Sequence, residues 1–456
     1  MKTMNKSFKR VLSLFLVLMM AMTTLVIFPI GALASSPPLE VEEDYAPVWA
    51  DPENVLTQAD IDSFNGGNKT SPLGAVAPFK RSASSGSSSY GQISTGEAKY
   101  YWFFPSNADL SYLTLWFDTS NTVKINGTAI ESGDGTDAFA SINEGGVSME
   151  VTLEVKVGSS TTSYNVTAIK SSDVGTVYID TNSGSIRSIT TSKDNYESGT
   201  IMVVQPDGTV DYMGELEKMS GRGNGTWTPI STTERYGGEK NPYNIKLAVS
   251  TSLLGMDKAK KWCLLANAGD ETLVKNQLTY DFAKYIGIKY QPTCKPVDLY
   301  VNQQYYGSYQ LSEKVEIKSS RINLSQDIYE NLEIANGTVD ATTGAITPAD
   351  LTGTAVQTEN QTTIGQFIKR DVTGQTIGAK RYSNTLTNPA DITGGYLYEL
   401  EISNRWVNEN AGFCAYNRQG WVIKNCDYAT PDMVNYSYNL LYALGSAVYN
   451  GGTVPS

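Results

Sequence analysis

Apolar and polar residues alternate with a period of two between residues 97 and 172. The runs 113–117, 151–157 and 164–168 each place every second apolar side chain on one face. The dipeptide Asn126-Gly127 follows another short apolar run and is typical of a tight turn. Alternation over short runs separated by such turns predicts antiparallel strands with one buried face. We therefore expect a small, all-β sandwich over residues 97–172.

From Gly175 onwards the pattern changes, and strand-like runs are mixed with helical ones. Residues 270–286 repeat apolar side chains at helical spacing, with Asp270 as a candidate cap and Gly287 as the stop. The expected apolar stripe of this helix is Val274, Leu278, Phe282, Tyr285 and Ile286. A second helix is predicted after Pro431. Strands and helices together predict a mixed α+β domain over residues 175–456.

Two segments show neither the period of two that is typical of strands nor the spacing that is typical of helices. Residues 35–96 are rich in Pro, Ser, Gly and acidic residues, so we expect a disordered linker there. Residues 325–392 are polar and rich in Thr, Gly and Asn, and they are interpreted as a long insertion within the second domain.

The N-terminus has the pattern of a secretory signal. A basic start with Lys2 and Arg10 precedes an apolar run and the small residues Ala32 and Ala34. We predict a signal peptide over residues 1–34, with cleavage before Ser35. An uncleaved membrane anchor is the alternative, because the run approaches the length of a membrane span. With cleavage, the protein is secreted or displayed at the cell surface and has no membrane segment.

Composition narrows the possible chemistry. The net charge of −12 argues against nucleic acid and anionic membranes as partners, because both attract basic surfaces. The chain has no histidine, which excludes catalytic triads that contain histidine and metal sites that use imidazole. Its four cysteines are too scattered for a disulfide scaffold. They are expected to be buried thiols, or to include a bridge such as Cys414–Cys426.

Two clusters have residues suited to binding anions. In Gly221–Trp227, alternating glycines expose backbone N–H groups beside Arg222 and Asn224, an arrangement that fits phosphate oxygens. A tight turn between strands is the alternative. Lys246 lies between Ile245 and Leu247 on an expected strand, where a lysine is costly unless it is paired or faces a ligand. An edge-strand lysine that reaches solvent is the alternative.

Two further clusters follow. Lys275 and Asn276 come near the start of the first predicted helix, where they can orient an anion or a neighbouring loop. Ordinary helix capping explains Asp270 equally well. Residues 297–314 predict a hairpin that turns near Asn302 and ends on Glu313-Lys314. Glu313 is a candidate partner for a lysine or a nucleotide, and a surface salt bridge is the alternative.

The motifs GRGNGTW, PYNIKL, LLGMDKAKKWCLLAN, VKNQLTYDFAKYIGI, VDLYVNQQYYGSYQLSEKVE and GGYLYELE occur in this order. Together they resemble the CotH family, named for a spore coat protein, over residues 175–450. The resemblance implies an atypical kinase-like fold and an exported enzyme that phosphorylates Ser or Thr of extracellular proteins with ATP and Mg²⁺ or Mn²⁺. The preceding sandwich is similar to cadherin-like modules of bacterial surface proteins.

The resemblance also assigns roles. It implies that Arg222 and Asn224 lie near the nucleotide phosphates, that Lys246 is the nucleotide lysine, and that Lys275 and Glu313 occupy family positions of the same site. Gln303 departs from the glycine usual after Asn302. The family's C-terminal part, which carries the catalytic and metal-binding aspartates, has no counterpart between Pro431 and Ser456. We therefore expect a chain that is incomplete at its C-terminus and inactive, with catalytic residues unknown.

Two other classes of function remain open at this point. A non-catalytic adhesion or assembly protein could use the same fold without a nucleotide. A carbohydrate-binding protein would use some of the 28 tyrosines and 7 tryptophans, although most of them lie in strand patterns typical of a core. The partner expected for the kinase interpretation is a protein substrate at the cell surface or wall.

Overall fold

The computed structural model describes residues 48–65, 72–81, 99–143, 148–223, 226–227, 240–268, 270, 272–360, 379–401, 405–416 and 419–453. The described residues form two compact units, 48–315 and 316–453. The predicted signal peptide and the candidate Asn224 lie outside the described residues.

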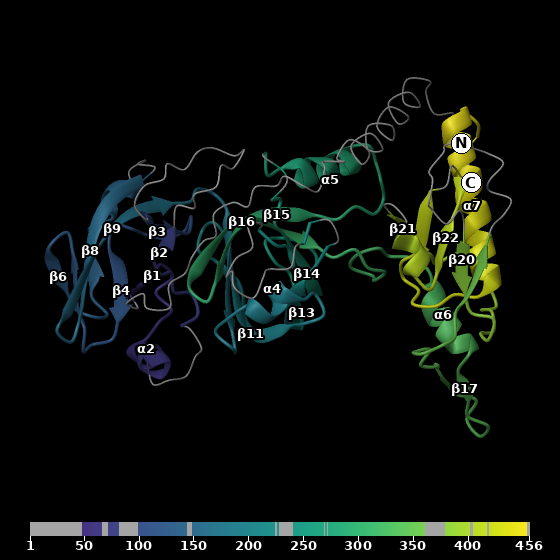
Figure 1. Ribbon diagram of the computed structural model, residues 1–456, viewed down its shortest axis with the longest axis horizontal. Coiled ribbons are helices and arrows are strands. Elements are labelled where there is room, and N and C mark those ends of the chain that lie inside the picture. The colour runs from purple at the N-terminus through teal and green to yellow at the C-terminus, as the bar shows by residue number, and fades with distance from the viewer. Residues whose placement is uncertain are drawn as a thin grey trace. The chain divides into compact units, whose positions relative to one another are not determined.

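The first part of unit 48–315 is a β-sandwich of two sheets (Figure 1). The sheets have the strand orders β1-β4-β7 and β2-β3-β9-β8-β5-β6. The alternating residues of 113–117 and of 151–155 are buried in one core, as the period of two predicts. The strands are β1 (Val48–Asp51), β2 (Phe79–Arg81), β3 (Lys99–Phe104), β4 (Leu113–Phe117), β5 (Thr122–Ile125), β6 (Thr128–Ile130), β7 (Gly135–Thr136), β8 (Ser148–Val157) and β9 (Ser160–Lys170).

The sandwich begins earlier in the chain than its pattern indicates. Within residues 35–96, for which the sequence predicts a disordered linker, β1 and β2 pair with sandwich strands, and helix α2 (Gln58–Asn65) lies between them in sequence. Trp49 and Ile61 are buried in a small cluster beside β1. The linker prediction is therefore wrong for the described part of 35–96. A few apolar residues are enough to fold this segment because they add to a core that other strands already form. They are spaced too widely along the chain to give a periodic pattern.

The second part of this unit is a closed barrel with the order β10-β11-β12-β13-β14-β16-β15. Its pairs are antiparallel except β10 with β15, which are parallel. Ile245, Trp262 and Leu299 belong to its interior cluster. The strands are β10 (Gly175–Thr181), β11 (Glu197–Val204), β12 (Val210–Gly221), β13 (Tyr243–Thr251), β14 (Ala259–Leu265), β15 (Cys294–Val301) and β16 (Gln304–Glu313).

The sandwich and the barrel share apolar packing. Tyr178, Met202 and Tyr300 of the barrel belong to the core cluster of the sandwich. The hydroxyl of Tyr300 donates to the carbonyl of Phe103 at 3.2 Å, and the rings of Phe103 and Tyr305 stack at 4.3 Å. The exterior of the barrel on β10 and β15 is thus covered by the sandwich.

Helix α5 (Lys275–Tyr285) lies outside the barrel, between β14 and β15 in sequence (Figure 1). Gly287 follows it with a left-handed φ of 81°, as predicted for the residue after a helix. The predicted apolar stripe is wrong, however. Val274, Leu278 and Tyr285 are 49%, 66% and 86% exposed, whereas Ala283 is buried and Tyr280 bonds to Ser312 of the barrel. The helix therefore packs with a smaller, more polar face than the sequence indicates.

Unit 316–453 contains α6 (Ile328–Ala335), η2 (Arg405–Asn408) and α7 (Pro431–Asn450), with α7 packed along strands β20 and β22 (Figure 1). Thr430 caps α7 by accepting a hydrogen bond from the Met433 amide at 3.2 Å. The strands are β17 (Thr338–Val339), β18 (Ile346–Thr347), β19 (Gln357–Asn360), β20 (Ala379–Tyr382), β21 (Tyr398–Glu401), β22 (Gly412–Cys414) and β23 (Gly420–Ile423).

The segment 325–392 is not a loop throughout. Asp327 caps α6, and Ile328 and Leu332, one helical turn apart, are fully buried in the core of this unit. Leu351 joins the same core. The polar composition of the segment hides this short helix, because two buried positions are enough to fix it. Residues 361–378 of the segment lie outside the described part of the chain.

These elements confirm a mixed α+β fold with sheets. Cys263, Cys294, Cys414 and Cys426 are all buried thiols outside any disulfide, so the alternative of a Cys414–Cys426 bridge is not formed. Within the described residues, no helix is both long enough and apolar enough to cross a membrane.

Candidate functional site: a cationic face on the barrel exterior

Lys246 points outward from the barrel. Its neighbours Ile245 and Leu247 are buried in the interior, and the strand alternation places Lys246 on the opposite side, with 41% of its side chain exposed. Its ammonium group forms an ion pair with Glu217 of β12. The lysine is therefore both paired and partly solvated, which accounts for its position on an apolar strand without a ligand.

Lys246 is the middle residue of a row of lysines. The register of the sheet sets Lys218 of β12 directly opposite Lys246, and Lys246 directly opposite Lys261 of β14. Lys260 approaches the second oxygen of Glu217 at 3.8 Å. Like charges that face each other across strands destabilise a sheet, and Glu217 offsets part of this repulsion. The row thus concentrates lysines on one face of a chain whose net charge is −12.

The charge of Glu217 is stabilised by these lysines. The hydrogen bond from Lys246 lowers the pKa of Glu217, and the charges of Lys246 and Lys260 act in the same direction. The carboxylate is thus ionised at any neutral or alkaline pH at which the lysines are charged. Glu217, Lys218 and Lys261 were not among the candidates from the sequence. Their positions depend on a β-bulge between Leu216 and Lys218 that no sequence pattern reveals.

Arg222 lies at the end of the same part of the barrel. Its amide donates to the carbonyl of Pro242 at 3.1 Å, which continues the pairing of β12 with β13. Its guanidinium lies near Tyr280 of α5, where its positive charge partly counteracts the effect of burial, which raises the pKa of Tyr280. Pro242 directly precedes β13 and is four positions from Lys246, or about 13 Å of extended chain. Arg222 and Lys246 therefore lie on the same part of one sheet, separated by several residues of β13.

The fold itself explains why glycine is present at two positions of the 221–227 cluster. A side chain at Gly221 would overlap the indole of Trp227. Gly223 has a left-handed φ of 90°, and its carbonyl accepts a hydrogen bond from Lys193 at 2.8 Å. These contacts agree with the tight-turn alternative for the glycine pattern. They do not test whether Arg222 binds an anion, so that role stays a prediction.

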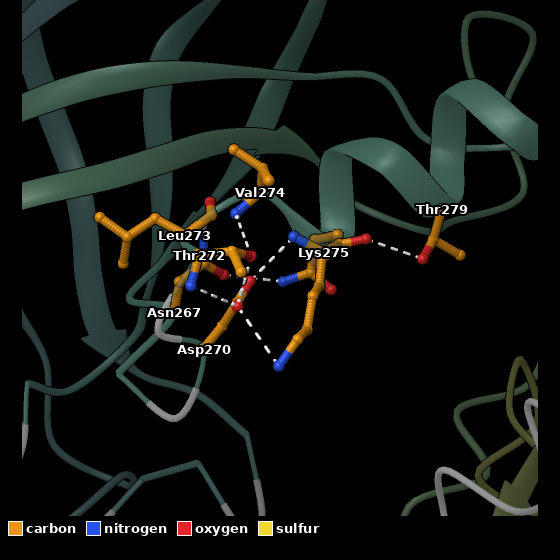
Figure 2. A network of polar contacts seen from close by, with 8 residues as sticks. Asn267, Asp270, Thr272, Leu273, Val274, Lys275 and Thr279 are labelled. Carbon is orange, nitrogen blue, oxygen red and sulfur yellow. Dashed lines mark hydrogen bonds and ion pairs between the residues drawn. The ribbon is translucent and has the colours of Figure 1, made fainter.

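Lys275 belongs to a polar network at the start of α5, shown in Figure 2. One carboxylate oxygen of Asp270 accepts hydrogen bonds from Thr272, and the other accepts from the amide of Lys275 at 2.8 Å. The Lys275 ammonium lies 3.4 Å from Asp270. Burial alone would raise the pKa of Asp270, but these hydrogen bonds and the lysine charge lower it to about 2.

This network is compatible with helix capping, one of the two interpretations of the sequence. Asn267 donates to the carbonyl of Leu273 at 2.9 Å (Figure 2). Asn276 donates to the side chain of Asn267 at 2.8 Å. Asp270 thus fixes the first turn of α5 from four residues before the N-cap position, Val274. The side chain of Lys275 remains 63% exposed and can reach a ligand outside the network.

Glu313 is the last residue of β16. Its carboxylate accepts a hydrogen bond from the amide of Thr293 at 3.0 Å, and the residue lies opposite Trp262 in the sheet. The carboxylate that contacts Lys246 is Glu217. The pairing of Lys246 with Glu217 was not predicted from the sequence, and the role of Glu313 toward a lysine or a nucleotide stays a prediction.

Comparison with known families identifies the middle of the chain. Residues 221–374 match the family model described as CotH kinase protein. This part of the chain is thus similar to the CotH family, and the matched region begins at the glycine cluster and includes Lys246, Lys275 and Glu313. It ends before the motif at 394–401. No match was found among curated proteins.

Proposed function

We propose that this CotH-type protein binds ATP at the cationic face of the barrel, which is the first requirement for transfer of the terminal phosphoryl group to Ser or Thr hydroxyls of proteins. The observation that carries the proposal is the row Lys218–Lys246–Lys261, which lies inside or beside the region that matches a kinase family. Phosphoryl transfer depends mainly on positioning and on positive charge around the phosphates. A row of directly opposed lysines supports both requirements.

In this proposal Arg222, at the loop end of β12, and Lys275, at the start of α5, also contact the phosphates. Arg222 offers a planar fork for two phosphate oxygens, whereas the lysines act as point charges. Glu217 pairs with Lys246 in the structure, so a bound phosphate would have to share or replace this pairing. The lysine would then exchange one anionic partner for another, without a new desolvation cost.

The metal expected from the family does not have a matching set of ligands in the described residues. No group of three or more Asp, Glu, Cys or His side chains is placed there to hold Mg²⁺ or Mn²⁺. We therefore derive no step through a metal ion. For the same reason, the first test of the proposal is nucleotide binding rather than turnover.

The substrate proposed is a protein of the cell surface or wall, because the N-terminal pattern favours export. N-terminal sequencing of secreted material should begin at or near Ser35. Recovery of intact Met1 in a membrane fraction would instead support the uncleaved anchor.

A non-catalytic adhesion or assembly role is the second candidate, and the ion pair between Lys246 and Glu217 favours it, because the lysine is already neutralised. Nucleotide dependence separates the two. Thermal unfolding should be measured with ATP, with ADP and with adenosine at equal concentrations. The kinase proposal expects ATP to raise the Tm most and adenosine least. Equal curves with all three compounds would support the adhesion role.

A further inference from the structure

Helix α5 turns its apolar side away from the barrel. Tyr280 and Ala283 face the barrel, where Tyr280 bonds to Ser312 and Ala283 is buried. At about 100° of rotation per residue, Leu278 and Tyr285 lie on the opposite side of the helix, and they are 66% and 86% exposed. An amphipathic helix of a folded domain normally buries its apolar side. The reversed orientation indicates that α5 contacts something outside its own barrel.

Several neighbouring apolar side chains make up this surface, which we call the outer stripe of α5. They are Leu278, Phe282, Tyr285 and Ile288, all partly or largely exposed. The ring centroids of Phe282 and Tyr285 are 6.5 Å apart, so the two aromatic side chains are neighbours on the surface. Their spacing of four and three residues is the one with which one helix packs on another. The outer stripe is therefore shaped to receive a second helix.

One edge of the outer stripe carries two opposite charges. Asp281 and Lys284 are three residues apart, so they lie on the same edge of the helix, and both are exposed. When two antiparallel helices are related by a two-fold axis, the same edge of each helix faces the other. With this axis between Phe282 and Ala283, Asp281 of each copy faces Lys284 of the other. Leu278 then lies beside the end of the partner's stripe, so apolar side chains meet as well.

We propose that α5 pairs with α5 of a second copy of this chain, antiparallel and about this two-fold axis. The arrangement buries both outer stripes and matches each Asp281 with a Lys284. The helical part of the stripe, from Leu278 to Tyr285, is only about 10 Å long. The contact is therefore smaller than the roughly 800 Å² per partner of a standard interface. The dimer is accordingly weak and depends on protein concentration. It does not use Lys246 or Lys275, so it is independent of the proposed function.

The alternative occupants of the outer stripe are a helix of a different protein and another segment of this chain. Both leave the purified chain monomeric at every concentration. Neither requires that the charges at positions 281 and 284 match each other. A second copy predicts self-association, and it also predicts which residues meet across the axis. The alternatives are therefore separated by the state of association and by exchange of these two charges.

The first test is sedimentation velocity of the purified chain from about 1 µM to about 300 µM, a range that includes weak interfaces. We expect wild type to show a monomer–dimer equilibrium. Leu278→Asp should weaken the dimer at least about tenfold, because it replaces an apolar contact with a charge on each copy. The circular dichroism of this variant should match wild type, because the side chain is 66% exposed. Met213→Asp, at a 56% exposed position on β12, is the matched control and should dimerise as wild type.

Exchange of the two charges tests the register of the pair. Asp281→Lys and Lys284→Glu each place like charges face to face across the axis, so each variant alone should dimerise about tenfold more weakly than wild type. An equimolar mixture of the two should dimerise again at the same total concentration. In the mixed pair the new lysine of one copy faces the new glutamate of the other, and the original Asp281 faces the original Lys284.

Three results would overturn the proposal. Wild type that stays monomeric up to the highest concentration would assign the outer stripe to one of the other occupants. A folded Leu278→Asp variant that dimerises as wild type would place the dimer contact elsewhere on the chain. A mixture of Asp281→Lys and Lys284→Glu that associates no more strongly than either variant alone would exclude the antiparallel pairing about this axis.

Discussion

Gln303 accepts a hydrogen bond at 2.8 Å from the indole of Trp49, a residue 254 positions earlier in the chain. Gln303 is in the turn between β15 and β16, and both it and Asn302 have a left-handed φ, 64° and 49°. The carbonyl of Gln303 also accepts from the amide of Ala77 at 2.9 Å. The glutamine that replaces the expected glycine thus connects the barrel turn to β1 and to the start of β2.

This relationship predicts unequal effects for two substitutions. Gln303→Ala keeps the strained φ and loses the side-chain bond, so the free energy of unfolding should fall by about 1–2 kcal/mol. Gln303→Gly loses the same bond but relieves the strain, which is worth about 1 kcal/mol, and should cost less. Urea unfolding measures both. Trp49→Phe alone and combined with Gln303→Ala completes a double-mutant cycle, in which the loss in the double variant should be smaller than the sum of the two single losses because both remove the same hydrogen bond. Equal losses in Gln303→Ala and Gln303→Gly would contradict this account.

Lys240 predicts a pH dependence in the alkaline range. Its ammonium donates to the carbonyl of Ser308 and lies 4.3 Å from the centre of the Tyr309 ring. Burial lowers its pKa to about 8, although Asp298 acts in the opposite direction. Between about pH 8 and the ordinary lysine pKa of 10.5, the unfolded chain binds more protons at this residue than the folded one. Folding stability at this site therefore rises with pH across that window.

The measurement is the free energy of unfolding of wild type and of Lys240→Met, from about pH 7 to about pH 10.5. Other lysines and tyrosines titrate in both proteins, so the difference between the curves isolates Lys240. We expect wild type to gain up to about 3 kcal/mol relative to the variant across this range. Parallel curves would show that the lysine is not desolvated in the folded state.

Asp270 predicts a pH dependence of the same sign in the acidic range, because its pKa is also lower in the folded chain than in the unfolded one. Its folded pKa of about 2 lies below the ordinary value of 3.8, so its contribution is complete above about pH 4 and is lost as pH falls toward 2. Asp270→Asn should remove this dependence and cost about 1 kcal/mol at neutral pH, as loss of a helix cap does. Unfolding curves between about pH 2 and about pH 6 check it. Asp281→Asn, also on α5, is the control and should keep the wild-type profile.

The regular patterns of the sequence predict local structure well. The alternation in 113–117 and 151–157, the Asn126-Gly127 turn and the helix stop at Gly287 all depend on neighbouring residues. These features need no knowledge of distant parts of the chain. The same is true of the helix after Pro431.

The features that the sequence did not reveal depend on contacts between distant segments. The strand β1 forms because Trp49 contacts Gln303 and a core of later residues. The apolar stripe of α5 suggested the wrong buried face, because Tyr280 meets Ser312 on the barrel instead. The partner of Lys246 is Glu217, which lies at the bulge in β12 and was not predicted from the sequence. Such pairings follow from register, which a single sequence does not specify.

The most direct test of the proposed function is calorimetric titration of ATP into wild type, Lys246→Gln and Glu217→Gln. If the cationic face holds the phosphates, Lys246→Gln should weaken binding about tenfold, as loss of one charge-assisted contact does. Glu217→Gln should strengthen binding, because it removes the competing anion from Lys246. Lys124→Gln on the sandwich is the matched control and should bind as wild type. Absence of heat in wild type, or equal affinity in all four proteins, would contradict a nucleotide site on this face.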